Sequence, residues 1–353
     1  MNAEELQRLV KSGNVIQDMD LGGGDFRNAD LGGGVFRKSL LRGANLSGAY
    51  LKEAVFIDCD LSGACLDNAD LALASVINAS AAGLQARAAK LPHAKFVNPV
   101  LTEAVFSDAD LTLASFVDAE LGGACFERVR FHKTSMINPK LRGARFTGAT
   151  FHRSALIKPV LDAADLGGVT MEMTYLSKPC LAGFDFTGLR LYACNFSEAD
   201  LRGAKFLDAE IVQLNLPEAD LSEAVFDRAR ATGLNLYKAR LAGTRFVGTR
   251  MDQAILVEAD LTGANLTKAT LSMAQLGKTR CVSTVFTGAD LSYADLSHAV
   301  LVGCDFTGAR LERTNLHEVL DDDSIWSGEE KAAALTTDEG RAKAERWTPP
   351  APA

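Results

Sequence analysis

The stretch "ADLTLASFVDAELGGACF", residues 109–126, decides the fold. It places a large apolar residue at every fifth position, at Leu111, Phe116, Leu121 and Phe126. An alanine stands two positions before each of them, and the remaining positions are mostly polar or glycine. A period of five fits neither the 3.6-residue period of a helix nor the two-residue period of a strand. The chain must therefore turn in another way.

The same register continues without interruption from Leu21 to Leu316. Most of these positions are Leu or Phe, none is charged, and the exceptions are Val76, Ala81, Ala86, Met136, Met171, Ile211, Ala231, Met251 and Cys281. We expect each five-residue unit to form a short extended side and a tight turn. Four units then close a square coil of 20 residues, and about 15 such coils stack at the strand spacing of about 4.8 Å.

This stretch and "ADLTGANLTKATLSMAQL", residues 259–276, resemble pentapeptide-repeat proteins, whose pattern is A(D/N)LXX. The resemblance covers about residues 19–318 and implies an all-β fold, a right-handed quadrilateral β-helix with short helical caps at both ends. We expect three parts: an N-terminal capping helix in 1–15, a β-solenoid in 16–318, and an acidic helical cap with a Pro-rich tail in 319–353. The fold serves many unrelated roles and does not by itself indicate a function.

The N-terminal cap has a helix-start signature. Asn2 followed by Glu5 matches a capping box, and Leu6, Leu9 and Val10 form an apolar stripe. We expect a helix over residues 2–12 that covers the first coil, because an open stack of strands exposes unpaired backbone.

The C-terminal segment has weaker signals. Ser327 before Glu330 and Thr336 before Glu339 predict two short helices, each beginning at a capping hydroxyl. We expect two apolar side chains to cover the last coil, Trp326 and Leu335.

Composition indicates a cytoplasmic protein. The N-terminus, "MNAEELQRLVKSGN", has acidic residues where a signal peptide has basic ones, and no apolar run approaches the roughly 18 residues of a membrane span. The net charge is −8, and the seven cysteines show no C-x-x-C spacing, so we expect reduced thiols.

Residues that carry chemistry are scarce, and the sequence predicts neither an enzyme nor a cofactor. His132 and His152 are one coil apart and could approach a metal ion, but zinc sites in proteins use three or four protein ligands. Lys133 and Arg153 lie beside them and repel a cation. We therefore expect no metal site there.

The position after each large residue should point outward. On one side of the square it is a β-branched aliphatic in six consecutive coils, Ile57, Ile77, Val97, Val117, Ile137 and Ile157. Contiguous apolar surface usually marks a contact. Because β-branched residues also suit a sheet face that has no partner, that reading stays open. We predict that these six residues bind a protein.

The resulting hypothesis is a non-enzymatic interaction rod, a scaffold or adaptor. Its partner is another protein or a second copy, held through the aliphatic residues or through the C-terminal segment. The resemblance permits a role in bacterial secretion or in another macromolecular assembly.

The alternative is a DNA-mimic protein that binds and protects a topoisomerase, as the resemblance implies for some members of the family. Mimicry requires a uniformly acidic surface. Here basic and acidic residues share one corner column: Arg130, Arg190, Arg230, Arg250 and Arg310 with Asp30, Asp70, Asp110 and Asp290. The scaffold is therefore favoured, and no direct binding of nucleic acid is expected.

Overall fold

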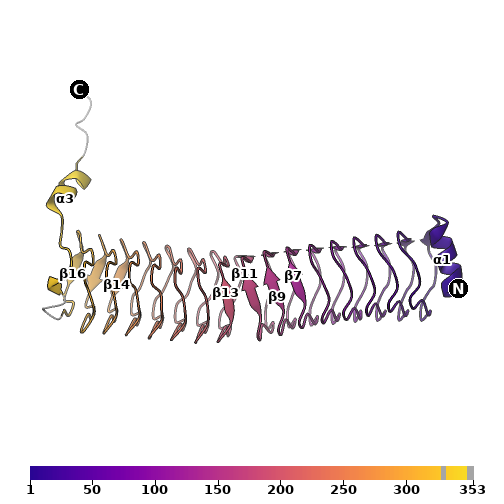
Figure 1. The fold of residues 1–353 in the computed structure, drawn as a ribbon, viewed down its shortest axis with the longest axis horizontal. Helices are drawn as coiled ribbons and strands as arrows, with labels where there is room; N and C mark the ends of the chain where they lie inside the picture. Colours follow the sequence, from indigo (N-terminus) through magenta and orange to yellow (C-terminus); the bar gives the residue numbers. More distant parts are fainter. Residues whose placement is uncertain (327–330, 348–353) are drawn as a thin grey trace, which may run out of the picture. The chain divides into compact units, whose positions relative to one another are not determined.

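A computed structural model describes residues 1–326 and 331–347 of the chain. The chain divides into two compact units, Met1–Cys180 and Leu181–Ala353. Each unit is a parallel β-solenoid, and the two together have about 15 turns, as the sequence predicted. Figure 1 draws them in indigo to magenta and in magenta to yellow.

The first unit begins with one helix and continues with short strands, each of three residues. The elements are α1 (Ala3–Lys11), β1 (Val15–Gln17), β2 (Val35–Arg37), β3 (Val55–Ile57), β4 (Ser75–Ile77), β5 (Lys95–Val97), β6 (Ser115–Val117), β7 (Arg130–His132), β8 (Ser135–Ile137), β9 (Thr150–His152), β10 (Ala155–Ile157), β11 (Thr170–Glu172) and β12 (Tyr175–Ser177). One side of the solenoid is a nine-stranded sheet in the order β1-β2-β3-β4-β5-β6-β8-β10-β12. Strands β7, β9 and β11 pair on a second side.

All pairs in the nine-stranded sheet are parallel, and their register is one coil. Phe96 pairs with Phe116, and Phe116 pairs with Met136. On the other sides isolated bridges keep the same offset, as between Cys65 and Gln85. The 20-residue closure expected from the five-residue period is therefore confirmed.

The large residue of each repeat fills the interior, and rings on successive turns stack. The ring centroids of Phe96 and Phe116 are 4.6 Å apart with an interplanar angle of 3°, and both rings are buried. The small residue two positions earlier lies at the inner corner, and Ala94 and Ala114 are 1% exposed. Burial of a large apolar side chain stabilises by roughly 1.5–3 kcal/mol, and here each contribution depends on the neighbouring turns.

Tight turns separate the sides. At Phe26 the chain makes a turn in which the backbone N–H of Ala29 donates to the Phe26 carbonyl over 3.1 Å. Asn28, the third residue of that turn, has a φ of 55°. A type II turn needs a positive φ at this place, which Gly and Asn adopt most readily.

Helix α1 covers the first turn, as predicted (Figure 1). The backbone N–H of Glu5 donates to Asn2 Oδ1 over 2.9 Å, and the Asn2 N–H donates to Glu5 Oε2 over 3.1 Å. Leu6 and Val10 are buried against the solenoid, and Lys11 pairs with Asp30 at 2.9 Å. The capping box expected from the sequence is thus confirmed.

The second unit has few regular strands and is held mostly by single bridges at the 20-residue offset. Its elements are β13 (Arg190–Tyr192), β14 (Arg280–Val282), β15 (Val300–Val302), β16 (Leu320–Asp322) and α3 (Glu339–Glu345). Strands β14, β15 and β16 pair in that order.

The C-terminal cap differs in part from the expectation. The N-cap of helix α3 is Asp338 and not Thr336, because the Asp338 carboxylate accepts the N–H groups of Gly340 and Arg341 over 2.8 and 3.0 Å and also interacts favourably with the helix dipole. Trp326 stacks on Phe306 with centroids 4.0 Å apart, as expected. Leu335 pairs with the last turn through its backbone, because its N–H donates to the Thr314 carbonyl and its own carbonyl accepts from the Leu316 N–H, both over 2.8 Å, but its side chain is 49% exposed.

The capping signal at Ser327 and Glu330 lies outside the described residues. Within residues 1–326 and 331–347, none of the helices has the length and apolarity that a bilayer crossing requires.

Substitution of Phe206 tests how far stability depends on the stacked interior. Its ring lies between those of Phe186 and Phe226, with centroids at 4.7 and 4.5 Å. We expect Phe206→Ala to lower the free energy of unfolding by about 3–5 kcal/mol, because it leaves a cavity in a fully buried stack. The exposed neighbour Lys205→Ala should change it by less than about 0.5 kcal/mol. Denaturant titration followed by circular dichroism measures both, and equal effects would contradict a stack-dependent core.

Candidate functional site

The structure brings all six predicted binding residues into one unbroken column. They lie on β3, β4, β5, β6, β8 and β10, at the last residue of each strand. Consecutive members are direct register partners: Ile57 with Ile77, Ile77 with Val97, Val97 with Val117, Val117 with Ile137, and Ile137 with Ile157. We call this column the aliphatic strip.

The strip faces solvent but is not fully exposed. Ile137 is 37% exposed and the other five side chains are half-buried, because each rests on its neighbours in the next turns. At the strand spacing the strip is about 24 Å long. It ends at Arg37 on β2 and at Ser177 on β12, which pair with Ile57 and Ile157.

A polar column lies immediately beside the strip, at the corner residue that follows each strand. It consists of Asp58, Asn78, Asn98, Asp118, Asn138 and Lys158, and we call it the amide ladder. The amide nitrogen of Asn98 donates to Asn78 Oδ1 over 3.2 Å, and that of Asn138 donates to Asp118 Oδ1 over 2.9 Å. All six residues have a positive φ between 50° and 55°. Asn and Asp tolerate that conformation well, so the ladder follows from the turn geometry.

The column on the other flank is mostly small. It consists of Val55, Ser75, Lys95, Ser115, Ser135 and Ala155, the first residue of each strand. Apart from Lys95, none of these side chains reaches far from the backbone. The strip and its two flanks therefore form a flat face, in which the aliphatic residues are accessible from one direction.

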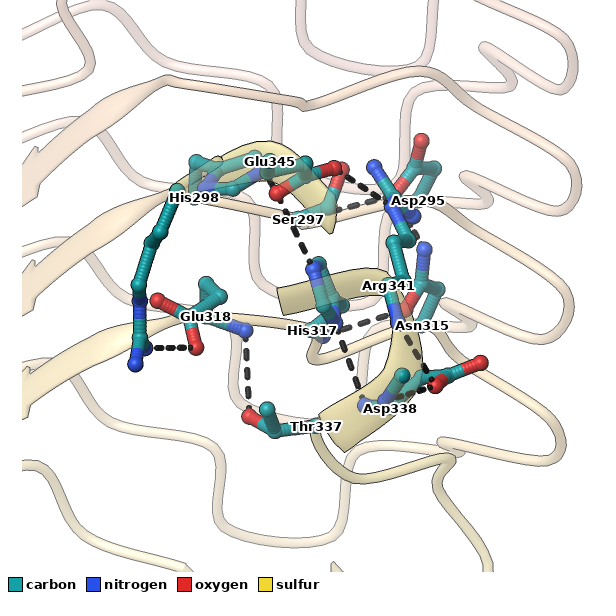
Figure 2. A network of polar contacts seen from close by, with 12 residues as sticks. Asp295, Ser297, His298, Asn315, His317, Glu318, Thr337, Asp338, Arg341 and Glu345 are labelled. Carbon is teal, nitrogen blue, oxygen red and sulfur yellow. Dashed lines mark hydrogen bonds and ion pairs between the residues drawn. The ribbon is translucent and has the colours of Figure 1, made fainter. Parts of the chain in front are cut away.

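A second polar feature, in the second unit, has no counterpart in the sequence predictions. Figure 2 shows a network that fastens the segment around α3 to the last turns of that unit. The buried imidazole of His317 is central to it. Its Nε2 lies 3.2 Å from Glu345 Oε2, and the backbone N–H of Asp338 donates to its Nδ1 over 3.1 Å. We call this network the C-terminal latch.

Further contacts strengthen the C-terminal latch. Arg346 donates to Glu318 Oε1 over 2.7 Å, and the Glu318 N–H donates to the Thr337 hydroxyl over 3.1 Å. The Arg341 guanidinium, which donates to Glu345 over 2.7 Å, holds the pKa of that carboxyl below its usual value, and the hydrogen bond from His317 adds to the effect. The carboxylate is therefore the form that the network favours.

His298, His317 and Glu345 also have the composition of a metal site. One ligand atom from each lies within 4.8 Å of the others, and His298 Nε2 is 3.1 Å from Glu345 Oε2. However, the Nδ1 of His317 accepts a backbone N–H, so the proton of the neutral ring must be on Nε2. That nitrogen then donates to Glu345 and has no lone pair for a metal. The cluster serves as a latch in this arrangement.

The other histidine pair lies on β7 and β9. The Nδ1 atoms of His132 and His152 are 2.8 Å apart, and His152 Nε2 is 3.8 Å from Glu172 Oε1. Partial burial, His152 and the charges of Lys133 and Arg153 lower the pKa of His132. In the described part of the chain no third ligand atom converges with the two Nδ1 atoms.

Sequence reasoning missed the C-terminal latch because no period connects its members. His317 follows the last large residue of the repeat, and Glu345 lies 28 residues later. The only signal is a histidine at a position where the preceding turns carry Gly277 and Ser297.

Comparison with known proteins agrees with the fold. The family described as "Pentapeptide repeats" matches in eight copies, over residues 35–72, 94–132, 114–153, 174–206, 208–243, 244–280 and 279–317. No curated protein sequence is significantly similar to this chain.

Two solved pentapeptide-repeat structures match this chain at low sequence identity. QnrB1, described as a plasmid-mediated fluoroquinolone resistance protein, is 18% identical over 44% of this chain and 91% of its own, with a TM-score of 0.33. HetL from the cyanobacterium Nostoc is 20% identical over 89% of this chain and 96% of its own, with a TM-score of 0.20. At these identities and scores neither match supports a conclusion about this chain.

Replacement of His317 tests the C-terminal latch. His317→Ala removes two hydrogen bonds and leaves the Asp338 N–H without its acceptor. A seven-residue helix does not persist when undocked, so we expect the amides of Ala342 and Arg346 to exchange at least about 10-fold faster. Hydrogen exchange with mass spectrometry measures this. The exposed His93→Ala is the control, and unchanged exchange in His317→Ala would show that other contacts hold α3 in place.

Proposed function

Because the chain belongs to the pentapeptide-repeat family, we propose that it is a non-enzymatic scaffold that binds a protein partner through the aliphatic strip. The observation that carries this proposal is the unbroken column of six β-branched side chains on the solvent face of one sheet. Isolated apolar residues are normal on protein surfaces, whereas a contiguous apolar patch usually marks a contact.

The composition of the flat face supports a protein as the partner. The amide ladder offers donors and acceptors along the whole strip, and the small residues on the other flank let a partner approach the sheet closely. An apolar centre with a polar rim is the common anatomy of a protein interface.

The repeat itself does not require the strip. Beyond its ends the same position carries Arg37 and Ser177 on equally regular strands. A polar residue is therefore compatible with the sheet, and stacking within the column is not a sufficient reason for six aliphatic residues in succession.

The topoisomerase-binding alternative has less support. The sequence predicts the acidic and basic residues of this repeat position at a corner, whereas in the structure they lie on the sides of the solenoid and form bridges between turns. There acidic residues pair with basic ones one turn away: Asp290 with Arg310 at 3.4 Å, Glu210 with Arg190 at 3.1 Å, and Glu120 with Lys140. These pairs neutralise the columns locally, whereas a surface that imitates DNA needs an unbroken row of negative charge.

Site-specific crosslinking tests the strip as a contact surface. A photoreactive amino acid at Ile137 should give discrete protein adducts in native lysate. Unlabelled wild-type protein should compete for these adducts, and Ile137→Asp protein should not, because a buried charge in an apolar contact is strongly unfavourable. The matched control places the same photoreactive amino acid at Val282 instead of Ile137. Val282 is a half-buried β-branched residue at the same repeat position of β14. Equal adducts at both positions would contradict the proposal.

A supercoiling assay with purified DNA gyrase tests the alternative. We expect no inhibition and no protection from a quinolone drug at equimolar protein, because the acidic columns are interrupted by arginines and lysines. Inhibition or drug protection at that ratio would favour the topoisomerase-binding function over the scaffold.

A further inference from the structure

The charges that border the aliphatic strip are arranged in a self-complementary way. The amide ladder begins with an acidic residue, Asp58, and ends with a basic one, Lys158. Both side chains are exposed, and Asp58 Oδ1 accepts a hydrogen bond from the Asn78 amide over 3.3 Å. Among the residues that the structure describes, neither Asp58 nor Lys158 forms an ion pair. We propose that the strip binds a second copy of this chain in an antiparallel, two-fold symmetric arrangement. This inference rests on the proposed function and names the partner.

The geometry follows from placing two identical flat faces against each other. A two-fold axis that runs across the strip, between β5 and β6, reverses the order of the turns and keeps each column opposite its own counterpart. Within the strip, Ile57 then faces Ile157 of the second copy, Ile77 faces Ile137, and Val97 faces Val117. Every contact in this column is aliphatic on both sides.

The amide ladder becomes complementary in the same arrangement. Asp58 faces Lys158 of the second copy, and the symmetry makes this contact twice. Asn78 faces Asn138, and Asn98 faces Asp118, so amides meet amides or a carboxylate. The opposite flank places Ser75 against Ser135 and Lys95 against Ser115, and no like charges meet in the six turns.

Other registers are less favourable. A shift by one turn toward the C-terminus puts Asp58 opposite Lys178, but it also puts Asp118 opposite itself and Lys158 opposite the neutral Asn78. A shift toward the N-terminus puts Lys38 opposite Lys158. In a parallel arrangement, with the axis along the strip, the amide ladder faces the small column, and Asp58 and Lys158 meet Val55 and Ala155. Only the centred antiparallel register places Asp58 of each copy opposite Lys158 of the other.

The extent of the contact is also limited by charge. One turn beyond the strip, Lys38 would face Lys178 of the second copy, so the complementary face ends with the six turns. Its area is about 24 Å by about 10 Å per copy, well below the roughly 800 Å² per partner of a standard interface. We therefore expect a weak dimer with a dissociation constant on the order of 10–1,000 μM.

Sedimentation equilibrium at low salt, with protein up to about 1 mM, tests the proposal. We expect the wild-type chain to dimerise and Ile137→Asp to remain monomeric. Lys158→Asp places two pairs of like charges in the interface and should weaken the dimer at least 10-fold, whereas Val282→Asp should not weaken it.

Charge reversal on both sides is the decisive measurement. Asp58→Lys combined with Lys158→Asp restores the pairs and should return the dissociation constant to within about 3-fold of wild type. The antiparallel register would be overturned if Lys158→Asp left the dissociation constant of the dimer unchanged, or if the double variant did not recover the wild-type dissociation constant. The neutral variants Asp58→Asn and Lys158→Gln, expected to be intermediate, repeat the test should a reversal disturb folding.

The outcome also separates this inference from the proposed function. A wild-type chain that stays monomeric throughout overturns self-pairing. Adducts at Ile137 that contain a different protein would then leave the strip as a binding surface for that protein. If the wild-type chain stayed monomeric and Ile137 gave no specific protein adducts, the proposed scaffold function of the aliphatic strip would be overturned as well.

Discussion

The structure depends on one constraint, namely that each five-residue unit must bury its large side chain inside a coil of four sides. A coil of this size cannot form a stable interior alone, because a single layer of Leu and Phe exposes both of its faces. Stacking covers each layer with the next, as for Phe96 and Phe116 with ring centroids 4.6 Å apart. The 20-residue register of every strand pair then follows, since a shift of one residue would turn the apolar set outward.

The same constraint determines what the surface can do. Because equivalent positions of successive turns lie one strand spacing apart, any residue type that recurs every 20 residues becomes a column. The turn at each corner requires a positive φ, which favours Asn, Asp and Gly there, and Asn98 has a φ of 50°. The amide ladder is thus a product of turn chemistry, while the aliphatic strip beside it lies on extended residues and is free of that requirement. This difference is the reason to assign a function to the strip and not to the amide ladder.

Much of the fold could be predicted from the sequence, because it repeats one local rule. The register from Leu21 to Leu316 and the alignment of Ile57 to Ile157 follow from counting in steps of five, and the capping box follows from the local spacing of Asn2 and Glu5. The C-terminus could not be predicted in the same way. Its contacts, such as Asp338 to His317, join a non-repeating segment to a repeat position and depend on a docking geometry that no period encodes. For the same reason the side chain of Leu335 was expected to cover the last turn and is instead half-exposed, although the Leu335 backbone pairs with that turn.

Symmetry gives a repeat surface an additional property. In a solenoid, the residues of one column follow each other in a fixed order. When two copies meet in antiparallel orientation, the column of one copy faces the same column of the other copy in reverse order. Most columns are not self-complementary, and the columns with paired Arg and Asp one turn apart, as Arg310 and Asp290, already satisfy their charges within the chain. The amide ladder is different, because Asp58 and Lys158 stand at its two ends, about 24 Å apart, where they cannot reach each other, while the carboxylate between them, Asp118, accepts a hydrogen bond from Asn138. Two copies in reverse order satisfy both charges at once and cover the aliphatic strip between them, so the polar border and the apolar centre favour the same arrangement.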